Sequence, residues 1–146
     1  MAVTIKNLDR LITKMNNLSD VDVENYVKKA TTFVHGQAKN LAPVDSGHLR
    51  ESIHMETKKE KNKVIGRVYT NTVYAPFVEF GTGIRGDGQY EYASELDFTL
   101  VYKQDWVGMS PQPFMYPALK GAETYVKKMI SGGIQSEINK IAKGGR

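Results

Sequence analysis

The sequence contains no cysteine among its 146 residues. Disulfides, thiol nucleophiles and cysteine-based zinc or iron–sulfur sites are therefore excluded. Histidine is scarce, with only His35, His48 and His54, and no apolar run approaches the roughly 18–20 residues of a membrane-spanning helix. The N-terminus lacks the basic stretch and apolar core of a signal peptide. We therefore expect a soluble protein from a reducing compartment, or one indifferent to redox, with no membrane partner.

The composition is ordinary for a folded chain of one domain, with 40% apolar and 25% charged residues. The charge is unevenly placed, because the net charge of +4 falls within residues 120–146. In the remainder, residues 56–67 are basic and residues 79–105 are acidic. A subunit with regions of opposite sign can pair head to tail with its own copies. The candidate residues for subunit or partner contacts are Lys58, Lys59, Lys61, Lys63, Arg85, Asp87, Glu91 and Glu95.

Hydrophobic spacing predicts helices first and strands next. Apolar residues at helical intervals indicate a short helix over residues 5–18, capped by Thr4, and a long one that follows a Ser19-Asp22 capping box. The long helix should end near Leu41, before Pro43. A turn follows, in which Asp45 or Ser46 caps a short helical stretch. Alternating polarity then predicts strands over residues 53–60 and 63–71.

The second half of the chain is less regular. Residues 73–80 suit either a strand or a helical turn begun by Pro76. Residues 81–94 indicate a glycine-rich loop, and residues 98–102 a strand. A helix is predicted after Pro117, with a break at Gly132-Gly133. Residues 1–131 would form one domain, and residues 132–146 a basic extension that includes a short helix. This order indicates an α+β fold, an antiparallel sheet with the long N-terminal and the C-terminal helix packed on one face.

No catalytic, cofactor-binding or metal-binding constellation is evident. Gly81 to Gly86 spell GxGxxG, but no helical stripe or βαβ unit follows, so nucleotide binding is a weak alternative. His48 and His54 do not share a helical face, and His35 lies on the polar side of the long helix. Ser46 is explained by its turn. Glu79, between Val78 and Phe80, is expected to pair with Arg50 or Arg67 rather than to act in catalysis.

A second hypothesis starts from the basic C-terminal segment, which could contact phosphates. It carries Tyr125 as its one aromatic residue, so base stacking has little support. A small nucleic-acid-binding module is therefore the alternative to an assembly protein.

Three blocks together resemble a known family. They are residues 42–53 (Ala-Pro-Val-Asp-Ser-Gly-His-Leu-Arg-Glu-Ser-Ile), residues 74–83 (Tyr-Ala-Pro-Phe-Val-Glu-Phe-Gly-Thr-Gly) and residues 111–119 (Pro-Gln-Pro-Phe-Met-Tyr-Pro-Ala-Leu). In order and spacing they are similar to the head–tail neck or tail-completion proteins of long-tailed phages, typified by the tenth gene product of a lambda-like phage. The resemblance spans about residues 20–130.

The resemblance implies structural work in the virion, without enzymatic activity or cofactors. Such a protein would be made in the host cytoplasm and would form a ring, hexameric by analogy with other neck components. The ring would join the head connector or stopper to the tail terminator or tail tube. Genomic DNA would pass through its lumen without sequence-specific recognition. The loop over residues 84–110 is then a candidate for contacts with neighbouring subunits.

Overall fold

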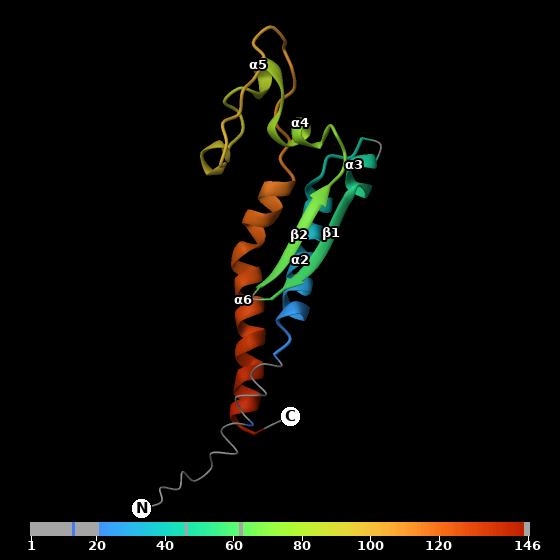
Figure 1. Cartoon of the computed structure of the whole chain (residues 1–146). Coiled ribbons are helices and arrows are strands. Elements are labelled where there is room, and N and C mark those ends of the chain that lie inside the picture. The colour runs from blue at the N-terminus through green and yellow to red at the C-terminus, as the bar shows by residue number, and fades with distance from the viewer. Residues whose placement is uncertain (1–12, 14–20, 46, 62, 145–146) are drawn as a thin grey trace, which may run out of the picture.

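The structure is a computed structural model that describes residue 13 and residues 21–45, 47–61 and 63–144. Figure 1 shows two helices side by side, with a β-hairpin along them and an irregular segment at one end. The described elements are α2 (Val23–Leu41), α3 (His48–Glu51), β1 (Ile53–Glu60), β2 (Lys63–Thr70), α4 (Ala75–Phe80), α5 (Gly83–Gly86), the 3₁₀ helix η1 (Ala93–Glu95) and α6 (Met115–Ala142). The predicted α+β class is confirmed. The helix predicted over residues 5–18, with its Thr4 cap, lies outside the described residues.

Helix α2 is the element against which α6, both strands and α3 pack. Asp22 caps it, and the Asp22 carboxylate accepts a hydrogen bond from the Asn25 N–H at 3.0 Å. The predicted capping box, with Ser19 as N-cap and Asp22 at N3, is therefore wrong, because Asp22 itself is the N-cap. The helix ends at Leu41 as predicted, because Pro43 forces Ala42 out of helical geometry. One face of α2 contacts both strands, and it also packs along α6.

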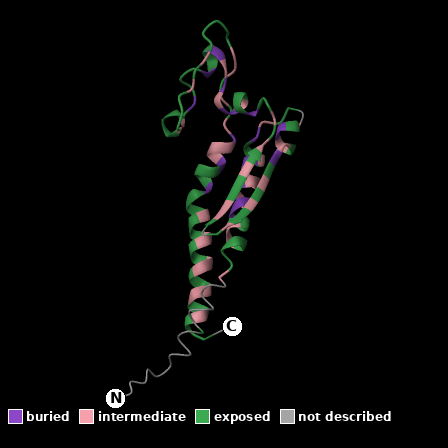
Figure 2. Cartoon of the chain, viewed as in Figure 1, coloured by how far each residue is buried: buried purple, intermediate pink, exposed green. Residues whose placement is uncertain are grey.

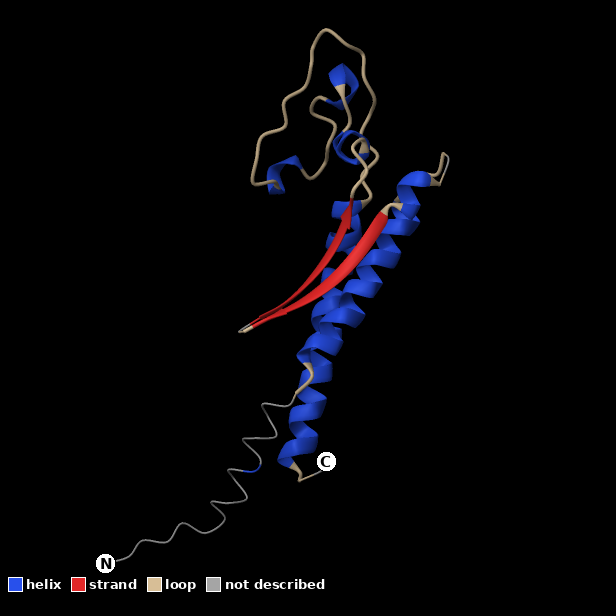
Figure 3. Cartoon of the chain, turned by 45° about the vertical axis from the view of Figure 1, so that its right-hand side comes forward, coloured by secondary structure: helices blue, strands red, loops and turns tan. Residues whose placement is uncertain are grey.

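The two strands form an antiparallel hairpin, paired from Ile53 opposite Thr70 to Glu60 opposite Lys63. This agrees with the predicted strands to within one residue. Gly66 lies where β2 crosses α2, and a Cβ there would overlap the Thr31 hydroxyl. Figure 3 shows the tip of the hairpin diverging from the helices.

The hydrophobic core gathers where α2 ends and α6 begins. Phe114 and Ile53 are its largest fully buried side chains, and Leu49 of α3 packs with them. Figure 2 shows how few residues of the lower helices are buried. Among the residues described, no helix is long and apolar enough to cross a membrane.

Several local predictions need correction. The N-cap of α3 is Gly47 in a left-handed conformation, without a side-chain cap, so Asp45 does not cap it. The open choice over residues 73–80 is resolved as helix α4, with Pro76 in its first turn. The strand predicted at residues 98–102 is wrong, because these residues enter no strand ladder. His35, placed by its spacing on the polar side of the long helix, is in fact half-buried, and its ring hydrogen-bonds the Ile53 carbonyl at 2.9 Å.

The predicted break at Gly132-Gly133 is also wrong, since α6 continues through both glycines for 28 residues. Gly133 faces α2, and the ring of Tyr26 occupies the space that a Cβ would take. The Tyr26 hydroxyl donates to the Glu137 carboxylate at 2.6 Å. The missing side chain therefore allows the end of α6 to pack against the start of α2. A separate role for residues 132–146 stays a prediction.

The two glycines predict opposite effects of the same substitution. Gly132→Ala meets no atom within 4 Å, so its higher helix propensity should stabilise the fold by about 0.5–1 kcal/mol. Gly133→Ala must displace Tyr26 and should lower the melting temperature relative to Gly132→Ala. Thermal unfolding of both variants, alone and combined with Tyr26→Ala, measures the effect. Equal stabilisation by both alanines would contradict this packing.

Candidate assembly interface

The segment between α4 and α6 is anchored by one buried carboxylate, Glu79, which is 5% exposed. It accepts hydrogen bonds from the backbone N–H groups of Phe114 at 2.7 Å, Met115 at 2.9 Å and Tyr116 at 3.1 Å. These N–H groups open α6 and have no partners within the helix, while Pro117 has no N–H to offer. The positive end of the helix dipole adds to the attraction. Glu79 therefore caps α6 from another part of the chain.

This finding corrects the expected pairing of Glu79 with Arg50 or Arg67. Arg67 lies 3.5 Å from Glu56 across the hairpin, and both side chains are exposed. The sequence suggests a cationic side chain as the partner of Glu79, whereas the observed partners in α6 are backbone amides about 35 residues away. No spacing rule marks such a contact.

Tyr90 completes the surroundings of Glu79. Its hydroxyl donates to the Glu79 carboxylate at 3.2 Å, and its ring meets Phe80 edge-on with centroids 5.0 Å apart. Burial raises the pKa of Tyr90, and the neighbouring Glu79 carboxylate raises it further. The hydroxyl therefore remains a proton donor throughout the physiological range.

The glycines of residues 81–86 allow this segment to approach the backbone of residues 106–109 closely. Gly83 and Gly108 both have positive φ, and a Cβ on either would overlap backbone of the other segment. Thr82 and Met109 pair there, with backbone hydrogen bonds of 2.8 and 2.9 Å. The run contains only the single helical turn α5, which Asp87 ends in extended geometry. The long helix required by a dinucleotide-binding fingerprint does not follow it.

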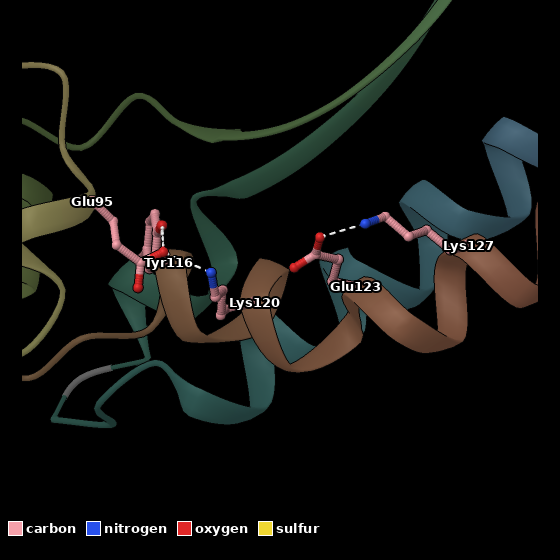
Figure 4. A network of polar contacts seen from close by, with 5 residues as sticks. All are labelled: Glu95, Tyr116, Lys120, Glu123 and Lys127. Atoms are coloured by element: carbon pink, nitrogen blue, oxygen red, sulfur yellow. Dashed lines mark hydrogen bonds and ion pairs between the residues drawn. The ribbon is translucent and has the colours of Figure 1, made fainter.

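A polar network joins η1 to α6 (Figure 4). The Glu95 carboxylate accepts from Lys120 Nζ at 2.6 Å and from the Tyr116 hydroxyl at 2.7 Å. The hydrogen bond from Lys120, and after it the one from Tyr116, lower the pKa of Glu95. The hydrogen bond to Glu95 in turn raises the pKa of Lys120. One turn further along, Lys127 pairs with Glu123 at 2.6 Å. Two basic residues of the C-terminal segment are thus engaged within the chain.

Four of the predicted interface residues lie at the tip of the hairpin. Lys58 and Lys63 share Glu60, at 3.7 and 3.3 Å. Lys59 and Lys61 are exposed and form no ion pair with any residue that the structure describes. The tip therefore presents uncompensated positive charge.

The other four lie on the irregular segment at the opposite end of the hairpin. Asp87 accepts from the Gln104 amide at 2.8 Å, the neighbouring Glu91 raises the pKa of Tyr92, and Glu95 belongs to the network above. Arg85 is exposed on α5. Eight strand residues span about 25 Å, so the basic tip and the acidic segment cannot pair within one chain. Their role in contacts between chains stays a prediction.

Sequence reasoning missed the apolar surface of the same segment. Val101 is 91% exposed, and Phe98 and Trp106 are each 56% exposed. Phe98 also lines a groove of about 600 Å³ that runs between α2, β2 and α6. Its apolar walls include Val27, Val68, Leu119, Val126 and Ile130. Such residues read as core in a sequence, because helical periodicity does not tell which face finds a partner.

The basic hairpin tip, the exposed apolar residues and the apolar groove are surfaces typical of a protein that binds other protein chains. Across the described part of the chain, no group of three or more His, Cys, Asp or Glu could hold a metal ion. The family model of bacteriophage HK97 gp10-like tail components matches residues 5–81, more than half of the chain. The chain belongs to this family and is a structural component of the phage virion. No curated protein and no solved structure matches it.

Removing the Glu79 carboxylate should release the irregular segment. Glu79→Leu leaves three backbone N–H groups and a tyrosine hydroxyl without their acceptor, which should cost at least about 2 kcal/mol. Tyr90→Phe removes a single hydrogen bond and should cost about 1 kcal/mol or less. Hydrogen exchange at Phe114, Met115 and Tyr116 provides the local readout. Unchanged protection of these amides in Glu79→Leu would contradict the capping role.

The Glu95 network should respond to acid. Because the pKa of Glu95 is lowered in the folded state, its contribution is present above its ordinary value of 4.5 and is lost as pH falls through the lowered value. Glu95→Gln should therefore lower the melting temperature at neutral pH, and the difference should vanish in acid. A difference that does not change with pH would contradict the charged contact.

Proposed function

We propose that this phage tail component acts at the head–tail interface as a neck or tail-completion protein without enzymatic activity. It forms a homo-oligomeric ring, hexameric by analogy with other neck components. The ring joins the head connector or stopper to the tail terminator or tail tube. Genomic DNA passes through its lumen, held by no sequence-specific contact.

The observation that carries this proposal is the separation of charge within a member of a phage tail-component family. The hairpin tip is basic, and the segment over residues 79–105 is acidic. The two sets lie at opposite ends of the hairpin. A contact between different surfaces of identical subunits closes into a ring when the rotation permits it.

The first test is the mass of the protein in solution by light scattering, with and without purified tails. A ring-sized mass in either sample supports the proposal and gives the copy number. A monomer in both, without tail binding, contradicts it. A DNA complex that weakens with salt and needs residues 132–146 would favour the nucleic-acid alternative instead.

Charge reversal at the hairpin tip should weaken assembly. Lys59→Glu combined with Lys61→Glu changes two exposed lysines without breaking an ion pair, so the stability of the monomer should stay within about 0.5 kcal/mol. Steering toward an acidic neighbour would be lost, and the ring fraction and virion yield should fall, most clearly at low salt. Lys28→Glu combined with Lys128→Glu, on the exposed faces of α2 and α6, provides a control of equal charge. Equal effects of the two pairs, or none, would contradict a role for the tip.

A further inference from the structure

One segment has the sequence of a strand but no strand partner. Residues 98–102 read Phe-Thr-Leu-Val-Tyr, a β-branched and aromatic run typical of a strand. No backbone–backbone hydrogen bond joins residues 97–102 to any part of the chain that the structure describes. The backbone groups of this segment are therefore available to another chain.

The same segment is held in place at both of its ends. The Tyr102 hydroxyl donates to the Phe80 carbonyl at 2.8 Å, and the Phe98 ring meets the Phe80 ring edge-on at 5.9 Å. Between these anchors, Thr99 and Val101 are exposed. The anchors tie the segment to α4, and among the described residues it does not pair with β2 of its own chain. They also reduce the entropy that would be lost when a partner binds it.

The complementary feature is the outer edge of β2. The described sheet has two strands, so this edge has no strand neighbour. Gly66, Val68 and Tyr69 of β2 line the apolar groove that α6 closes on its other side. An open edge next to an apolar groove is the arrangement that receives an added strand, because main-chain hydrogen bonds give affinity and the groove accepts side chains.

Charge complementarity identifies the occupant as a second copy of this chain. Asp97 precedes the segment and Lys103 and Asp105 follow it, within the acidic stretch of residues 79–105, while the hairpin carries Arg67 and the lysines of its tip. We propose that residues 98–102 of one subunit add as a third strand to the outer edge of β2 of the next. The contact joins two different surfaces, so its repetition closes a ring when the rotation between subunits permits it. This inference rests on the proposed function, for which it names the subunit interface.

The absence of cysteine makes disulfide trapping the direct test. One chain carries Val101→Cys, and a second, tagged chain carries one cysteine on the exposed face of β2, at Ile65, Arg67 or Tyr69. Matched controls carry it at their cross-strand partners on β1, which are Lys58, Glu56 and His54. A disulfide needs Cα atoms within about 7 Å, which an added strand satisfies for β2 but not for β1. We expect cross-linking of Val101→Cys to at least one β2 position and to none on β1.

Each other outcome overturns the inference in a recognisable way. Cross-linking to β1 alone places the contact on the wrong edge. A ring-sized mass without any of these cross-links rejects the strand contact but keeps the proposed ring. A monomer without cross-links rejects both.

A backbone substitution gives an independent readout. Leu100→Pro and Val101→Pro each remove an N–H that makes no backbone hydrogen bond with the described residues, so the melting temperature of the monomer should not change. Successive N–H groups of a strand point to opposite sides, so one of the two variants loses a ladder hydrogen bond to β2 and should weaken self-association about tenfold. Unchanged association in both variants would contradict strand addition.

Discussion

The contact between Glu79 and the first turn of α6 is the constraint on which the upper half of the molecule depends. One carboxylate binds three backbone N–H groups of the helix and the hydroxyl of Tyr90. It thereby ties α4, the irregular segment and α6 at a single buried point. A buried charge is tolerable only when its surroundings replace the lost water, and here the end of a long helix does so. The Thr82–Met109 pairing and the Glu95–Lys120 contact then hold the rest of the segment between α4 and α6.

Away from this point the structure is open. The hairpin rests on α2 by one face, with its tip free and with an outer edge that has no strand neighbour among the described residues. Apolar side chains stay exposed beside a groove that the described residues leave unfilled. A monomer with these features keeps unsatisfied surface that an assembly can bury. For a phage tail component, such surface is available for contacts with other chains of the virion.

The regular elements were predictable where local signals and packing agree. The strands of the hairpin follow from alternating polarity, and the end of α2 follows from Pro43. Prediction failed where a distant contact decides the local conformation. Gly133 reads as a helix breaker, yet Tyr26 packs into the space it leaves. Residues 98–102 read as a strand, yet they meet no ladder within the described chain.

The sequence by itself determined the class of fold, the helices and hairpin, the distribution of charge and the family to which the chain belongs. Each of these depends on residue type and on spacing along the chain, which a sequence displays directly. Only the tertiary structure decided that Glu79 binds backbone amides, that Glu95 forms an ion pair with Lys120 and that Val101 is exposed. The reason is that hydrogen bonds and burial depend on which distant segments meet, and backbone N–H groups are alike at almost every residue. Their availability is set by the ends of helices and the edges of sheets, which exist only once the chain has folded.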